Sequence, residues 1–136
     1  MSAVNHAETL MASKLPGELD SALSAIHVDA PNARVVVLDY PELYDLSRSS
    51  SCIGLSTTDR TDLNRGADQL DAQIQAASAR HGHVFADVRT AFSGHEICDS
   101  HSWLHSVNFL DVSESYHPTA AGQSGGYEPV SSATAG

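Results

Sequence analysis

Apolar residues along the first quarter of the chain recur with the spacing of α-helices. Residues 2–13 predict a short helix with one apolar side. A second helix is predicted over 15–26, because leucine, alanine and isoleucine return every three or four positions and Pro16 suits a first helical turn. The Ala-Pro-Asn sequence at 30–32 ends this helix. The chain therefore opens with two consecutive helices.

Two short runs predict strands, and the first of them, a β-branched run with few polar residues, is expected to be buried on both faces. They are RVVVLDY at 34–40 and HVFADV at 83–88. A Ser/Thr-rich loop at 46–58 and a long amphipathic helix at about 59–81 separate them. The polar positions of this helix predict a solvated face that carries Asp62, Asp68, Asp71 and Arg80.

The order helix, strand, helix, strand is typical of a parallel α/β sheet, whose ligands lie at the carboxyl ends of the strands. Two parallel strands alone leave both sheet edges open, so we expect them to belong to a larger sheet. Residues 1–136 form a single domain, in which the packing of 1–14 is left open and 131–136 are expected to fray. After a loop-like stretch, a short helix is expected at about 119–121.

Composition excludes several classes of protein. The 136 residues carry a formal net charge of −10, which disfavours nucleic-acid binding and attachment to anionic membranes. No apolar run is long enough for a stable membrane anchor, and the N-terminus does not have the pattern of a signal peptide. The two cysteines, Cys52 and Cys98, allow either one disulfide or two free thiols.

The segment SESYHPTAAGQ at 113–123 has the pattern of a site for a general base. His117 stands at the end of a loop, and the following Pro118 and small residues place it on a rigid turn. Glu114, three residues earlier, can hold the imidazole Nδ1–H through its carboxylate or its backbone carbonyl. The alternative is an exposed loop histidine with no such role.

Several segments together resemble the C-terminal half of secreted actinomycete SGNH (GDSL-type) lipases and esterases. The resemblance covers about 14–130 and rests on the runs ARVVVLDYPELY, LNRGADQLDAQIQAASARHG, VFADVRTAFSGHEIC, DSHSWLH and ESYHPTAAGQSGGY. It implies a three-layer αβα, flavodoxin-like fold, here incomplete because the N-terminal half with the nucleophile is absent. It also implies hydrolysis of carboxylic esters or lipids, an extracellular location, and no metal or organic cofactor.

The resemblance also implies residue roles. The catalytic histidine of the family falls on His117. Much of the family has an aspartate three residues before that histidine, whereas this chain has Glu114, so either Glu114 or the backbone carbonyl of Ser115 is expected to orient the imidazole. The late cysteine pair of the family maps onto Cys52 and Cys98 and implies a disulfide between them.

The nucleophile of the family has no counterpart in this sequence. Neither its Gly-Asp-Ser motif nor the Gly-Asn-Asp segment of its oxyanion hole is present. Three interpretations stay open: an inactive fragment or binding module, a chain completed by an N-terminal partner or by a homodimer, or a local substitute serine. The last has only abundance in its favour, at Ser47, Ser49, Ser50 and Ser51.

A different class of function comes from a cluster of histidines. The spacing of His95, Cys98, His101 and His105 could supply four ligands to Zn²⁺.

Trp103 lies between these histidines and is a candidate for the apolar wall of an acyl-chain pocket. The alternative is that it covers the loop against the sheet. The preferred hypothesis is an ester hydrolase with His117 as general base, and zinc binding is the third alternative after an inactive module.

Overall fold

Three helices form one side of the molecule. In the computed structural model, which describes residues 3–108 and 110–136, α1 (Ala3–Ser13) and α2 (Leu15–Asp29) follow each other and lie along α3 (Thr57–Arg80). Both predicted helices are confirmed, with Pro16 in the first turn of α2. Ser56 caps α3 by accepting the Asp59 N–H, so this helix begins two residues earlier than predicted.

The two predicted strands form a parallel pair with α3 as the crossover between them. β1 (Val36–Leu38) pairs with β2 (Val84–Ala86) in the register Val36 to Val84. Both strands are shorter than the sequence predicts. The reason lies at their carboxyl ends, where the N–H groups of Tyr40 and Val88 donate to aspartate side chains instead of to a neighbouring strand.

The C-terminal segment forms a more extensive helix than predicted. After the short helix α4 (Arg89–Phe92) and a long loop, α5 (Ala120–Gly122) continues through a π-helical turn (Gln123–Tyr127) into α6 (Glu128–Ala135). Helix α6 extends to Ala135, and Arg34 donates to the Thr134 carbonyl at 2.8 Å, so 131–135 are helical in the structure.

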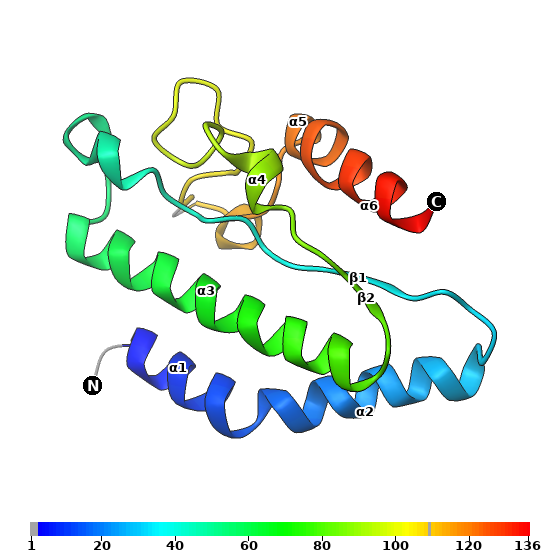
Figure 1. The fold of residues 1–136 in the computed structure, drawn as a ribbon. Coiled ribbons are helices and arrows are strands. Elements are labelled where there is room, and N and C mark those ends of the chain that lie inside the picture. Colours follow the sequence, from blue (N-terminus) through cyan, green and yellow to red (C-terminus); the bar gives the residue numbers. More distant parts are fainter. Residues whose placement is uncertain (1–2, 109) are drawn as a thin grey trace.

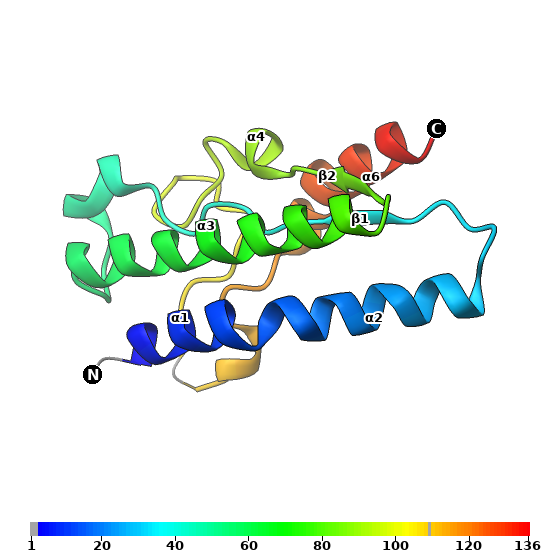
Figure 2. The same ribbon diagram turned by 60° about the horizontal axis from the view of Figure 1, so that its bottom comes forward.

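Helices cover the strand pair from both sides. Helix α6 packs on β1 and β2, and α3 packs on β2 from the opposite side, with α1 and α2 beyond it (Figures 1 and 2). The α/β class is thereby confirmed, and the sheet contains only two strands in the part of the chain that the structure describes. No described helix is long and apolar enough to cross a membrane.

The loop between α4 and α5 covers an apolar core instead of standing free in solvent. Its centre comprises Tyr44, Val88, Phe92, Ile97 and Leu104. The Phe92 ring meets Trp103 and Tyr127 edge to face, with ring centroids 5.5 and 5.4 Å apart. The loop is therefore folded against the strand ends and the C-terminal helix.

A disulfide joins this loop to the segment before α3. Cys52 and Cys98 are bonded, with a sequence separation of 46 and their Cα atoms 5.2 Å apart. The pairing implied by the family resemblance is confirmed. The bond connects the segment after the short 3-10 helix Leu46–Ser51 with the residues that follow α4.

Reduction of this disulfide is expected to destabilise the fold substantially. A closed loop of this length reduces the entropy of the unfolded chain, which corresponds to about 4 kcal/mol of unfolding free energy. Urea unfolding with and without dithiothreitol measures the difference. The double variant Cys52→Ser/Cys98→Ser is the control, and its unfolding midpoint should be low and unaffected by the reductant. Equal midpoints for the oxidised and reduced wild type would contradict the expectation.

We predict that a side chain at Gly126 would destabilise the fold. A Cβ atom there would overlap the ring of Phe92, whereas one at Gly17 in α2 would meet no atom within 4 Å. We expect Gly126→Ala to lower the free energy of unfolding by about 1–3 kcal/mol through overpacking. The matched change Gly17→Ala should instead raise it by about 0.5–1 kcal/mol, because alanine has a higher helix propensity than glycine. Urea unfolding compares the two, and similar effects would refute the packing argument.

Candidate active site

His117 lies in an open groove at the carboxyl end of β1. The groove has a volume of about 990 Å³, and the imidazole is exposed in it. One wall comes from the strand end and the other from the C-terminal helical segment; the lining includes Leu38, Asp39, Tyr40, Gln123, Ser124 and Tyr127. This is the edge of a parallel sheet where ligands are expected.

Backbone hydrogen bonds fix the segment that carries His117. Its carbonyl accepts the His105 N–H at 2.9 Å, and the Tyr116 N–H donates to the His105 carbonyl at 2.9 Å. Two residues further on, the Thr119 N–H donates to the Trp103 carbonyl at 2.8 Å. The segment thus runs antiparallel to 103–105, with a bridge between Leu104 and Pro118. The histidine is therefore presented from an ordered strand-like pairing.

The two candidate orienting residues lie on the turn before the histidine. The Glu114 carbonyl accepts the His117 N–H at 3.2 Å, and the Glu114 side chain is exposed. The Ser115 hydroxyl accepts the Asn108 N–H at 2.9 Å, which holds the preceding loop. Orientation of the imidazole by Glu114 or by the Ser115 carbonyl stays a prediction.

Trp103 packs beside the groove without being part of its lining. Its indole stacks on His95 with ring centroids 3.7 Å apart and an interplanar angle of 2°. The rest of the ring lies against Gly125 in the π-helical turn, where no Cβ would fit. These contacts hold Trp103 between the loop and the C-terminal helical segment, and its role as a wall of the acyl-chain pocket stays a prediction.

The zinc hypothesis is wrong for this chain. The Cys98 sulfur is bonded to Cys52 and offers no thiolate, and His95 Nδ1 lies 2.9 Å from the His101 carbonyl oxygen. Across residues 3–108 and 110–136, no group of three or more histidine, cysteine or acidic side chains is placed to hold a metal ion.

Ser47, one of the four candidate serines, does not lie beside His117 in the structure. Ser47 donates to the Asp45 carboxylate at 2.6 Å, near the start of the 3-10 helix, and does not line the groove. The side chains of Ser49, Ser50 and Ser51 lie outside the described part of the chain.

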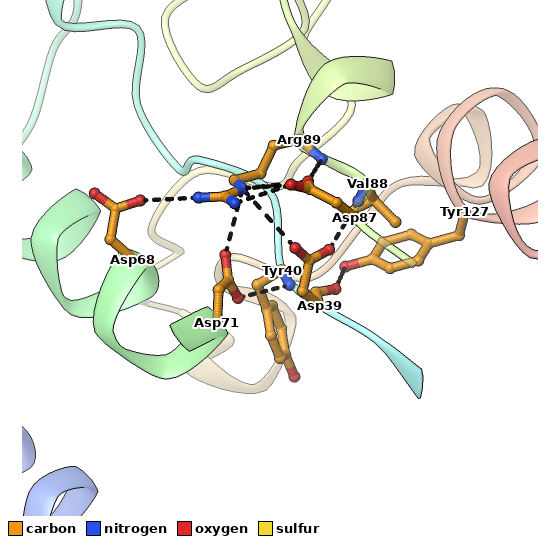
Figure 3. Close-up of polar contacts among 8 residues, drawn as sticks. All are labelled: Asp39, Tyr40, Asp68, Asp71, Asp87, Val88, Arg89 and Tyr127. Atoms are coloured by element: carbon orange, nitrogen blue, oxygen red, sulfur yellow. Dashed lines mark hydrogen bonds and ion pairs between the residues drawn. The ribbon is translucent and has the colours of Figure 1, made fainter. Parts of the chain in front are cut away.

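An acidic cluster beneath the groove is a feature that the sequence analysis missed. Figure 3 shows the Arg89 guanidinium facing the carboxylates of Asp39, Asp68, Asp71 and Asp87, at 2.9–3.9 Å. Asp71 was assigned to a solvated face of its helix, which is wrong, because it is only 3% exposed. Its spacing of three from Ile74, which faces the core, is the signal that could have placed it inside.

The two buried carboxylates of this cluster connect the elements around it. Asp39 accepts the Val88 N–H at 2.8 Å, and Asp71 accepts the Tyr40 N–H at 3.0 Å (Figure 3). The second oxygen of each has no hydrogen-bond partner among the described residues and faces Arg89. Burial raises the pKa of Asp39 to about 6 and that of Asp71 to about 7, although Arg89 opposes both shifts.

These raised pKa values predict that the fold loses stability as the pH rises from about 4 to 7. Over this range the unfolded chain releases its carboxyl protons first, so the folded state binds more protons and the free energy of unfolding falls with increasing pH. Asp71→Asn keeps an acceptor for the Tyr40 N–H and removes the buried charge. We expect it to be more stable than the wild type at pH 8 by about 2 kcal/mol and nearly equal at pH 4.

Urea unfolding at several pH values measures this effect. Asp68→Asn is the matched control, since Asp68 belongs to the same cluster but its side chain is 59% exposed. Its stability should follow the wild type at every pH. A destabilised Asp71→Asn at pH 8 would show that the charged form is the one the fold requires.

The chain is similar to lipases from Streptomyces. No protein-family model matches it. Lipase 1 of Streptomyces coelicolor is 54% identical over 130 residues, which cover 96% of this chain and 48% of that protein. A lipase of Streptomyces rimosus is 50% identical over 116 residues, covering 85% of this chain and 42% of the relative. The chain thus spans about half the length of these relatives.

Solved structures agree with the sequence relatives. The crystal structure of phospholipase A1 from Streptomyces albidoflavus superposes with a TM-score of 0.89 at 48% identity, covering 96% of this chain and 55% of that one. An extracellular lipase from Streptomyces rimosus gives the same TM-score at 45% identity, with the same coverage of both chains. The predicted resemblance is confirmed: the chain is homologous, along almost its whole length, to about half of a Streptomyces lipase.

Proposed function

We propose that the chain is the histidine-bearing half of an SGNH-type carboxylic ester hydrolase acting on lipid or other ester substrates. The observation that carries this proposal is the exposed His117 imidazole, held by backbone pairing in an open groove at the carboxyl end of a parallel sheet. The relatives named as lipases and a phospholipase A1 support the substrate class. The family's flavodoxin-like, three-layer αβα fold is part of the proposal.

In the proposed mechanism His117 acts as the general base. It takes the proton from a serine hydroxyl as the serine oxygen attacks the ester carbonyl, and it returns that proton to the departing alcohol. An acyl-enzyme remains. His117 then takes a proton from water, whose oxygen attacks the acyl carbon. The bond to the serine oxygen breaks, His117 gives its proton to that oxygen, and the carboxylic acid and the free serine are released. The Glu114 side chain or the Ser115 carbonyl would hold the other ring nitrogen, and no metal or organic cofactor takes part.

The serine and the oxyanion-hole donors would come from a complementing N-terminal chain or segment. The sequence has no Gly-Asp-Ser motif, and the relatives are about twice as long as the region they share with it. The side of β1 away from β2 carries no strand among the described residues, so it offers an edge for pairing. A homodimer that pairs this edge with a second copy is the alternative assembly.

We place the active protein outside the cell. The Cys52–Cys98 disulfide suits an oxidising compartment, and one structural relative is described as an extracellular lipase.

The runner-up function is a catalytically inactive module that binds a partner. The absent nucleophile motif favours this alternative.

The decisive experiment measures ester hydrolysis with and without the missing half. The purified chain is assayed with p-nitrophenyl butyrate, alone and together with the unmatched portion of the Streptomyces rimosus lipase. A serine-directed phosphonate followed by intact-mass analysis identifies the chain that holds the nucleophile. We expect turnover only in the mixture, and we expect His117→Ala to reduce it by about 10²–10⁴-fold because the general base is lost.

His101→Ala is the matched control, since His101 is also an exposed loop histidine but bonds locally to Ser100. Its activity should equal that of the wild type. Full activity in His117→Ala would remove this residue from the mechanism. If the mixture forms a complex but shows neither turnover nor adduct, the inactive module becomes the correct function.

A further inference from the structure

The residue before His117 adopts a backbone conformation that a tyrosine rarely takes. Tyr116 has φ 67°, in the left-handed region where a Cβ meets the neighbouring carbonyl oxygen. Among the described residues other than glycine, only Cys98 shares a positive φ, and that residue is held by the disulfide. Such a conformation persists only where the surrounding structure enforces it, and it is often found at functional sites.

The side chain of Tyr116 is in contact with Tyr44. The two rings meet edge to face with centroids 6.1 Å apart, and the Tyr44 hydroxyl donates to the Tyr116 hydroxyl at 3.3 Å. Tyr44 is itself immobilised, being 2% exposed, with its N–H and carbonyl both bonded to the Asn64 side-chain amide. Tyr116 is therefore anchored to a fixed part of the core.

The two adjacent side chains line different hollows. Tyr116 borders an apolar groove between α1 and α3, together with Leu43 and Leu63, whereas His117 borders the open groove at the end of β1. Because Tyr116 has a positive φ, its side chain and that of His117 can border different grooves. The Tyr116 N–H and the His117 carbonyl both form hydrogen bonds with the backbone of His105, which fixes the chain on both sides of the peptide between them.

We propose that Tyr116 is a positioning residue for His117: its left-handed conformation, anchored on Tyr44, directs the imidazole into the open groove and limits its rotation. This inference rests on the proposed role of His117 as general base. Tyr116 touches none of the reacting groups and acts only through the direction of the neighbouring side chain.

The test uses three substitutions that separate the ring, the hydroxyl and the backbone conformation. Tyr116→Phe keeps the ring contact and loses only the hydroxyl. Tyr116→Gly loses the side chain but adopts a positive φ without steric cost, and Tyr116→Ala loses the side chain and disfavours that φ. Ile74→Val, which removes one methylene from the buried face of α3, is the control for a small general loss of stability.

The primary readout is the ¹H–¹⁵N NMR spectrum of the His117 imidazole across a pH titration, which needs no activity. We expect a dominant ring tautomer in the wild type and in Tyr116→Phe, and averaging toward the values of a free histidine in Tyr116→Ala, with Tyr116→Gly in between. Ile74→Val should leave the His117 signals unchanged. A folded Tyr116→Ala with wild-type His117 signals would overturn the proposal.

Hydrolysis in the complemented enzyme provides the second readout. We expect Tyr116→Ala to lower kcat about tenfold with little change in KM, and Tyr116→Phe to stay within about twofold of the wild type. An equal loss in all three variants would assign the effect to the hydroxyl and overturn the backbone argument. If the complemented wild type shows no turnover, the proposed function fails, whereas the NMR comparison still decides the positioning role.

Discussion

The carboxylate of Asp39 holds together the edge of the sheet on which the candidate site is built. This carboxylate accepts the Val88 N–H and so joins the ends of β1 and β2. The backbone carbonyl of Asp39 accepts a hydrogen bond at 3.1 Å from the hydroxyl of Tyr127, which belongs to the C-terminal helical segment. One residue thus connects both strands to the segment that forms the far wall of the groove. Because the carboxylate is buried, it depends on Arg89 for its only nearby positive charge in the described structure.

The sequence was most informative where a single periodicity dominates. The helices at 3–29 and 57–80 could be predicted from the spacing of apolar residues, and both strands from short apolar runs. The strand lengths could not, because the side chains of Asp39 and Asp71 compete with the sheet for backbone N–H groups, and these partners come from distant parts of the chain. The acidic cluster could not be predicted either, because the residues around Arg89 come from a helix, a strand end and a turn that are far apart in the sequence.

The candidate site was predictable to a similar degree. The segment around His117 could be selected because a histidine, a proline and small residues stand together. The disulfide followed from the resemblance, and it excluded the competing zinc hypothesis. What local sequence could not reveal was the direction of the imidazole. That direction depends on the conformation of Tyr116, whose ring is in contact with Tyr44, 72 positions earlier in the chain.

The disulfide also bears on how fast the chain folds. The two strands pair across α3, so the sheet forms only after a long loop has closed, and non-local pairing of this kind is slow. The disulfide between Cys52 and Cys98, with a sequence separation of 46, closes a loop that overlaps this stretch and also contains α3. In an oxidising environment the cross-link would therefore hold the strand ends near each other before they pair, and less chain entropy is lost when the strands pair. A chain made under reducing conditions must find the same pairing unaided and exposes its strand edges for longer, which favours aggregation.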